Sequence, residues 1–160
     1  MYSIGDKVVY PMYGAGIIEA IEEQEFQGVV NQYYVMRMPL GDLKVMIPML
    51  NAEKIGIRSI IDGAEADRVL AAFAELETEC ELNWNKRYRE NMLKLKCGDI
   101  YEVAQVVKML MCRDVGKGLS TGEKKMLTNA KQILISELVL AKGMKQEEIE
   151  QIFLEAMETE

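Results

Sequence analysis

The spacing of apolar residues changes once along this chain, and the change divides it into two parts. Up to about residue 58, short runs rich in Val, Ile, Tyr and Met alternate with turn signals such as Gln27-Gly28. From Ala64 onward, apolar residues recur three and four positions apart, as they do on the buried side of a helix. The sequence therefore predicts an α+β protein, with a small β module at residues 1–58 and an all-α domain at residues 59–160.

The β module is predicted from four short segments in which apolar residues partly alternate with polar ones. These segments span residues 7–10, 16–22, 32–38 and 44–50. Four or five short strands within about 55 residues favour a small, strongly bent antiparallel barrel, because closure protects the edges of so small a sheet. The core of such a module is marginal in size, so we expect it to pack against its neighbour or a partner.

The all-α domain is predicted from apolar periodicity together with helix start signals. The expected helices span residues 65–76, a segment from Asn83 or Asn85 to about Lys96, residues 100–113, about 121–142, and 145–158. Either asparagine can cap the second helix, and Asp99 can cap the third. Ser120 followed by Glu123 has the spacing of a capping box, which marks the start of the fourth helix.

Charge is distributed unevenly along the chain, although the total formal net charge is −7. Residues 1–81 contain 6 Lys or Arg and 14 Asp or Glu, and residues 146–160 contain 6 Glu and no cation. Residues 82–145, in contrast, contain 13 Lys or Arg and 6 Asp or Glu, a net charge of +7. A basic block of this kind fits a phosphate-binding surface, and it fits equally well a solvated, lysine-rich helical surface.

The residue types that most often serve catalysis and zinc binding form no recognisable site in this sequence. The chain has no His, and its cysteines (Cys80, Cys97 and Cys112) lie far apart, so neither the commonest general base nor a zinc ligand set is present. We expect reduced thiols, no cofactor, no metal and no enzymatic activity. The longest apolar run, ILISELVLA, is broken by polar residues, and the first residues do not resemble a signal peptide. We therefore expect a cytoplasmic protein without membrane contact.

The only tryptophan, Trp84, begins the most basic segment of the chain, LNWNKRYRENMLKLK (82–96). At 100° per residue it shares a stripe with Tyr88, Met92 and Leu95, which favours a position in the core. Its place at the very start of the helix, where Asn85 could act as the cap, instead favours an exposed indole. Spacing alone therefore favours the core, and the position at the helix start keeps the exposed interpretation open.

In four stretches, at residues 5–22, 44–58, 84–110 and 118–138, the sequence resembles the CarD/CdnL family of bacterial transcription regulators. GDKVVYPMYGAGIIEAIE (5–22) and KVMIPMLNAEKIGIR (44–58) resemble the N-terminal module of the family, which also occurs in the transcription-repair coupling factor. WNKRYRENMLKLKCGDIYEVAQVVKML (84–110) and GLSTGEKKMLTNAKQILISEL (118–138) resemble the helical domain of the family. The resemblance covers about residues 2–143, and the helical half distinguishes the chain from the coupling factor.

The resemblance implies a Tudor-like β module that docks on the β subunit of RNA polymerase. It also implies a helical domain that contacts promoter DNA at the upstream edge of the transcription bubble. There Trp84 would wedge into the minor groove and support the open promoter complex. From this family likeness we expect a monomer that is associated with the nucleoid through RNA polymerase.

Site residues are carried over from the family by position. At the DNA they are Trp84, Lys86, Arg87, Arg89, Lys124 and Lys125, and at the polymerase they are Gln24, Val35, Met46 and Pro48. Some relatives have arginines in place of Gln24 and Met46, so the contact at position 46 would be apolar here. Two other functions remain open: a helical protein–protein adaptor with Trp84 in its core, and a polymerase-binding protein that contacts no DNA.

Overall fold

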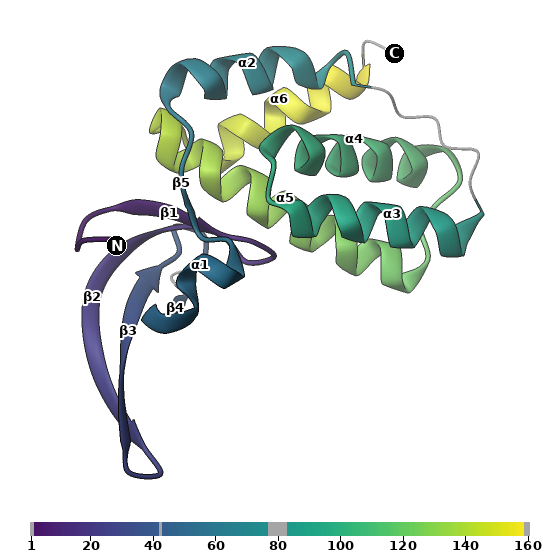
Figure 1. Cartoon of the computed structure of the whole chain (residues 1–160). Coiled ribbons are helices and arrows are strands. Elements are labelled where there is room, and N and C mark those ends of the chain that lie inside the picture. The colour runs from purple at the N-terminus through teal and green to yellow at the C-terminus, as the bar shows by residue number, and fades with distance from the viewer. Residues whose placement is uncertain (1, 42, 77–82, 159–160) are drawn as a thin grey trace.

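A computed structural model describes residues 2–41, 43–76 and 83–158 and shows an antiparallel sheet followed by helices (Figure 1). The strands are β1 (Lys7–Tyr10), β2 (Gly14–Phe26), β3 (Val29–Arg37), β4 (Lys44–Pro48) and β5 (Arg58–Ser59). They are hydrogen-bonded in the order β4-β3-β2-β1-β5. The α+β prediction is confirmed, and β5 straddles the domain boundary expected at residue 58.

The expected closure of the sheet into a barrel does not occur. Among the described residues, the two edge strands β4 and β5 pair with β3 and β1 only. A short 3-10 helix, η1 (Met49–Asn51), and a one-turn helix, α1 (Ala52–Ile55), connect these edges. Ala52 is buried in the core of the sheet, so this connection covers apolar surface that closure would otherwise cover. A register shift between Ile18 and Ala20 bends β2, as a bulge does.

The β2–β3 hairpin is longer than the sequence predicts, and its outer part projects away from the rest of the protein (Figure 1). Gln27 and Gly28 form its two-residue turn, with φ of 53° and 80°. Positive φ at both positions matches the tight turn that suits the twist of two antiparallel strands. Residues 21–30 are exposed, so pairing between the two strands, and not burial, maintains this part of the hairpin.

The helical domain contains the helices expected from the sequence. They are α2 (Gly63–Phe73), α3 (Trp84–Cys97), α4 (Ile100–Gly116), α5 (Thr121–Lys142) and α6 (Gln146–Glu158). The side chains of Asn83, Asp99 and Ser120 accept backbone N–H groups at the starts of α3, α4 and α5, which resolves the choice between Asn83 and Asn85. Apolar side chains of all five helices form one core, where Phe73 of α2 stacks on Phe153 of α6.

The sheet and the helical domain meet at the start of β2 and the second half of α5. The backbone N–H of Ala15 donates to the buried Ser136 hydroxyl at 2.8 Å. A Cβ at Gly14 would lie 2.7 Å from that hydroxyl oxygen and 3.3 Å from the Cα of Ile133, so this close approach requires glycine.

Arg58 and Glu137 form a second connection between the two modules. Both terminal guanidinium nitrogens of Arg58 lie 2.7 Å from the Glu137 carboxylate, and Arg58 also donates to the Gly98 carbonyl at the α3–α4 turn. Glu137 is buried and also accepts the backbone N–H of Ile61. A bidentate pair of this kind fixes orientation as well as distance. The two modules are therefore joined by directional bonds near residue 58.

Candidate nucleic-acid interface

The starts of α3 and α5 lie against each other, which brings the two predicted basic clusters to one end of the helical domain. Arg87, in the first turn of α3, forms an ion pair with Glu123 in the first turn of α5, with 2.8 Å between Nε and Oε2. The Trp84 indole reaches Ser120, the residue that caps α5. Segments 36 residues apart in sequence thus build one surface.

Trp84 is the first residue of α3, and its side chain is 43% exposed. Its indole stacks on the ring of Tyr88, with 5.1 Å between centroids and 20° between planes. The indole N–H donates to the Ser120 hydroxyl oxygen at 2.9 Å. Trp84 is therefore neither the core residue that its apolar stripe favours nor a freely rotating surface side chain. This argues against the adaptor with a buried tryptophan.

Arg87 does not lie on the surface with the other predicted DNA-contacting cations, and this corrects its expected place. Its residue exposure is only 4%, and its guanidinium donates to both carboxylate oxygens of Glu123. The hydrogen bond from Arg87 lowers the pKa of Glu123, against the opposing effect of burial. The buried stripe of α3 runs through Arg87, Asn91 and Leu95. The stripe predicted from apolar spacing runs through Tyr88 and Met92, each one residue after a buried position, because that prediction considered apolar residues only.

The remaining predicted cations are exposed: Lys86, Arg89, Lys124 and Lys125. Within the described part of the chain, no carboxylate lies within ion-pair distance of these four side chains. The one acidic residue in the first turn of α5, Glu123, is buried with Arg87 and does not offset their charge. The surface around Trp84 therefore presents positive charge to solvent.

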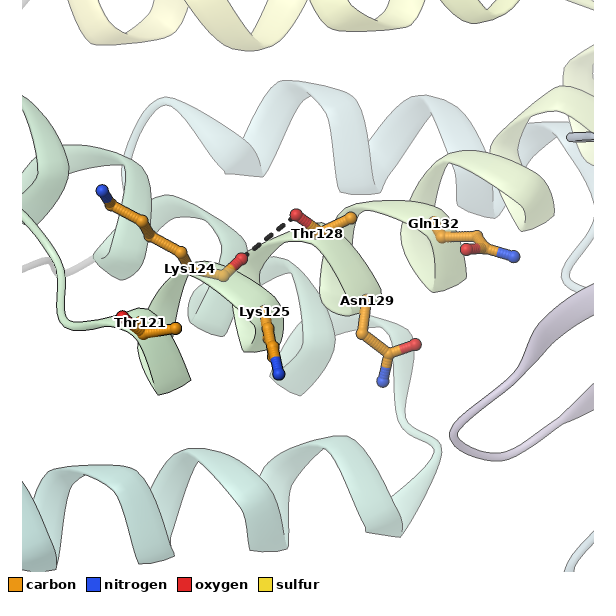
Figure 2. A pocket seen from close by; sticks show the side chains of 6 residues that line it. All are labelled: Thr121, Lys124, Lys125, Thr128, Asn129 and Gln132. Carbon is orange, nitrogen blue, oxygen red and sulfur yellow. Dashed lines mark hydrogen bonds between the residues drawn. The ribbon is translucent and has the colours of Figure 1, made fainter.

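Polar side chains continue this surface along α5, where they line a shallow depression (Figure 2). The depression is lined by Thr121, Lys124, Lys125, Thr128, Asn129 and Gln132. In this view Lys125 and Asn129 point the same way from the helix, whereas Lys124 points away from them. Thr128 donates its hydroxyl proton to the backbone carbonyl of Lys124. Amide and ammonium groups in this arrangement can donate hydrogen bonds to phosphate oxygens.

The four residues predicted to face the polymerase share one side of the sheet. Strand pairing places Val35 opposite Met46 and Tyr33 opposite Pro48, and Gln24 belongs to the same alternating set on β2. The Gln24 amide lies 3.8 Å from the Met46 sulfur, across the intervening strand. Met46 is 38% exposed, whereas Val35 is buried at the same face. The opposite side of the sheet carries the β-module core.

The same register shows residues on this face that sequence reasoning missed. Tyr33, Val29 and Phe26 continue it toward the hairpin turn, and Phe26 is 71% exposed. At the other end, Glu19 forms ion pairs with Arg37 and Lys44, and the hydrogen bond from Lys44 lowers the pKa of Glu19. The sequence marks Gln27-Gly28 as a turn, and pairing the two strands outward from it would have found the apolar extension, since that pairing fixes which residues share a face.

Comparison with known proteins gives two matches to family models. The model described as "CarD-like/TRCF RID domain" matches residues 2–61, and the model described as "CarD, C-terminal domain" matches residues 68–154. Together they cover the sheet and nearly all of the helical domain, in the order in which the structure presents them. The chain belongs to the CarD family.

A curated relative supports the same assignment over the whole length. YdeB of Bacillus subtilis (strain 168), a protein named as a candidate transcription factor, is 45% identical over 149 residues. The alignment covers 93% of this chain and 97% of the relative. This CarD family member is thus a relative of transcription regulators along both modules.

The other sequence expectations concern thiols, metals and membranes. Cys97 and Cys112 are free thiols, and Cys80 lies outside the described residues. Among the residues that the structure describes, no group of three His, Cys, Asp or Glu side chains could hold a metal ion. Within the same residues, the helices are too short or too polar to cross a membrane.

Proposed function

We propose that this CarD family protein docks on the β subunit of RNA polymerase and stabilises the open promoter complex. In this proposal the outer sheet face, defined here as Gln24, Phe26, Val29, Tyr33, Val35, Met46 and Pro48, contacts the polymerase. The Trp84 end, defined as Trp84, Lys86, Arg89, Lys124 and Lys125, contacts DNA at the upstream edge of the bubble. The protein acts as a monomer at the nucleoid, where it is held by the polymerase.

One observation carries the DNA part of the proposal: a half-exposed indole and four exposed cations lie at the adjoining starts of α3 and α5, in a protein whose net charge is −7. Lysines and arginines that neutralise phosphates release counterions, so this surface binds nucleic acid more tightly at low salt. Phosphate contacts position a protein without reading sequence. An apolar ring between the cations can then enter a partly unstacked base step, as wedging side chains do in the minor groove.

Such a wedge favours open over closed promoter DNA because the junction it fits exists only at the edge of a melted region. Inserting a ring into closed duplex costs a few kcal/mol of stacking, whereas the edge of the bubble is already unstacked. A ligand shifts an equilibrium only by its difference in affinity for the two states. A difference of about 1.4 kcal/mol changes the open-complex population about tenfold.

The polymerase part of the proposal is supported by the sheet face and by the family match. Residues 2–61 match the domain that CarD-like proteins share with the coupling factor. The apolar residues Phe26, Val29 and Met46 are exposed on one face. Exposed apolar residues that share one face of a sheet are typical of a protein-binding surface. Residues 1–58 contain 7 Asp or Glu and 5 Lys or Arg, so this module lacks the net positive charge that is typical of a DNA-binding surface.

The proposal is tested by measuring binding to purified β subunit and the lifetime of a promoter open complex, with and without this protein. We expect binding to the β subunit and a longer lifetime, with Trp84→Ala losing the longer lifetime while it keeps β-subunit binding. Equal lifetimes for the wild type and Trp84→Ala would leave a polymerase-binding protein without a wedge. Binding to neither polymerase nor promoter complexes at low salt would reject the whole proposal.

A further inference from the structure

The Ser120 hydroxyl forms hydrogen bonds with three groups: the Trp84 indole, the Glu123 backbone N–H and the Glu123 carboxylate. It accepts the indole N–H of Trp84 at 2.9 Å and the backbone N–H of Glu123 at 3.2 Å. Its own proton points to a Glu123 carboxylate oxygen at 3.4 Å. A serine hydroxyl has one proton to donate and two lone pairs to accept with, so this arrangement uses its whole capacity.

The groups around Ser120 are themselves held in place. Glu123 is buried and paired with Arg87, which ties the carboxylate to α3. On the other side, Tyr88 stacks against the Trp84 ring. A Cβ at Gly122 would lie 3.7 Å from Cζ2 of the indole and 3.6 Å from the Tyr88 ring, so α5 borders both rings closely. The indole is thus bounded by Tyr88, Gly122 and Ser120, and Trp84 as a whole is 43% exposed.

We propose that Ser120 is a positioning residue for Trp84: its hydroxyl oxygen accepts the hydrogen bond of the indole N–H and so fixes the orientation of the ring. This inference rests on the proposed function, in which Trp84 contacts the edge of the bubble. With its N–H bonded inside the protein, Trp84 presents only carbon surface to DNA. Minor-groove recognition by donors relies on acceptors such as adenine N3 and thymine O2, and Trp84 offers no donor to them.

Two consequences follow for DNA binding. A ring whose orientation is set before DNA arrives loses less conformational freedom on binding, and this favours affinity. A ring that contacts bases only through carbon accepts any base that can unstack, since every base has an apolar face. Ser120 therefore makes the wedge both ready to bind and tolerant of sequence at the step that it enters.

The test is a double-mutant cycle on open-complex lifetime at saturating protein, with Trp84→Phe and Ser120→Gly. Glycine is tolerated at the first cap position of a helix at little cost, so Ser120→Gly removes the acceptor and retains the start of α5. In the wild-type background we expect Ser120→Gly to shorten the lifetime roughly threefold to tenfold, about the effect of one hydrogen bond. In the Trp84→Phe background, where no indole N–H exists, the same substitution has no effect.

A purely structural role for Ser120 gives a different result, because a lost helix cap acts equally in both backgrounds. Equal effects of Ser120→Gly with tryptophan and with phenylalanine at position 84 would therefore overturn the proposal. Ser120→Thr retains the hydroxyl, so this variant should have the wild-type lifetime. A Ser120→Thr protein that behaves like Ser120→Gly would also count against it.

A second measurement needs no polymerase and uses the single tryptophan. The full-length protein gives one indole N–H signal in nitrogen–proton NMR spectra. We expect its exchange with solvent to be slow in the wild type and in Ser120→Thr, and fast in Ser120→Gly. If Ser120→Gly leaves both exchange and lifetime unchanged while Trp84→Ala shortens the lifetime, the positioning role fails and the wedge survives. If Trp84→Ala leaves the lifetime unchanged, the wedge fails and this inference fails with it.

Discussion

The Trp84 end and the outer sheet face are built by different means. At the Trp84 end, side chains from α3 and α5 hold one another through the Arg87–Glu123 pair and the Trp84–Ser120 bond. On the outer sheet face, backbone pairing sets the positions of residues, and the exposed side chains Phe26 and Met46 extend from it. The first surface is positively charged and internally bonded, whereas the second is largely apolar.

This difference indicates how the two surfaces should respond to change. Interactions with phosphates weaken with salt, while apolar contacts are far less sensitive to it. A surface organised by buried side chains is sensitive to substitutions beneath it, whereas one organised by strand pairing is sensitive mainly to the residues it exposes. The Arg58–Glu137 pair and the hydrogen bond between Ser136 and β2 join the sheet to the helical domain. These bonds fix the distance between the outer sheet face and the Trp84 end.

The largest effect is expected beneath the Trp84 end. Arg87→Ala leaves Glu123 as a buried carboxylate without its partner, which should cost about 3–5 kcal/mol of unfolding free energy. Denaturant unfolding of the purified protein measures this loss. Arg89→Ala, two positions along on the exposed side of α3, is the matched control and should change stability by less than about 0.5 kcal/mol. Equal stability losses would mean that Arg87 is not the interior residue that the structure describes.

A smaller effect is expected on the outer sheet face. Met46→Asp places a charge in the proposed apolar contact and should weaken binding to the β subunit by about 2 kcal/mol, roughly 30-fold. Equilibrium binding to purified β subunit measures the change, and the fold should be retained because Met46 is partly exposed. Leu154→Asp introduces the same charge at an exposed apolar residue of α6, outside both surfaces. If Leu154→Asp weakens binding as much as Met46→Asp does, the contact lies elsewhere.

Salt dependence separates the two surfaces further. Replacing both Lys124 and Lys125 by Ala should flatten the slope of log affinity against log salt by about 2 for binding to promoter DNA in the polymerase complex, because each phosphate contact contributes about one unit. Binding to the isolated β subunit should keep the same, shallow salt dependence in both proteins. An unchanged slope for DNA after the double substitution would remove these lysines from the interface.

The smallest effect is expected from acidification. The hydrogen bond from Arg87 lowers the pKa of Glu123 in the folded protein below its ordinary value of 4.5. The ionised carboxylate therefore stabilises the folded protein fully at pH values above that ordinary value. This contribution is lost as the pH falls through the lowered pKa in the folded state. Between about pH 5 and pH 3, the wild type should therefore lose more stability than Glu123→Gln, whose amide does not titrate. Parallel pH profiles of the two proteins would show that Glu123 does not contribute in this way.

Helix starts could be predicted from the sequence because caps are local. Asn83, Asp99 and Ser120 each act on backbone groups within three residues, so the residue types and their spacing suffice. The place of Arg87 could not be predicted in this way, because its partner Glu123 lies 36 residues away and charged residues are rarely buried without one. The Trp84–Ser120 bond spans the same distance in sequence, and no local pattern indicates it.

The sheet shows a similar division between local and distant signals. Alternation indicated the buried halves of β2 and β3, but the polar run around Glu22, Glu23 and Glu25 concealed how far the hairpin extends. Strand length there depends on pairing across the Gln27-Gly28 turn and not on burial. The open sheet also depends on η1 and α1, whose packing on the core follows from the tertiary structure.

The most direct test of the two-surface account is site-specific photo-crosslinking within one promoter open complex. A photoreactive residue replaces Met46 in one protein and Arg89 in another, both at exposed positions. The account predicts crosslinks from position 46 to the β subunit alone, and from position 89 to promoter DNA at the upstream edge of the bubble. Crosslinks from position 89 to protein without DNA, or from position 46 to DNA, would contradict it.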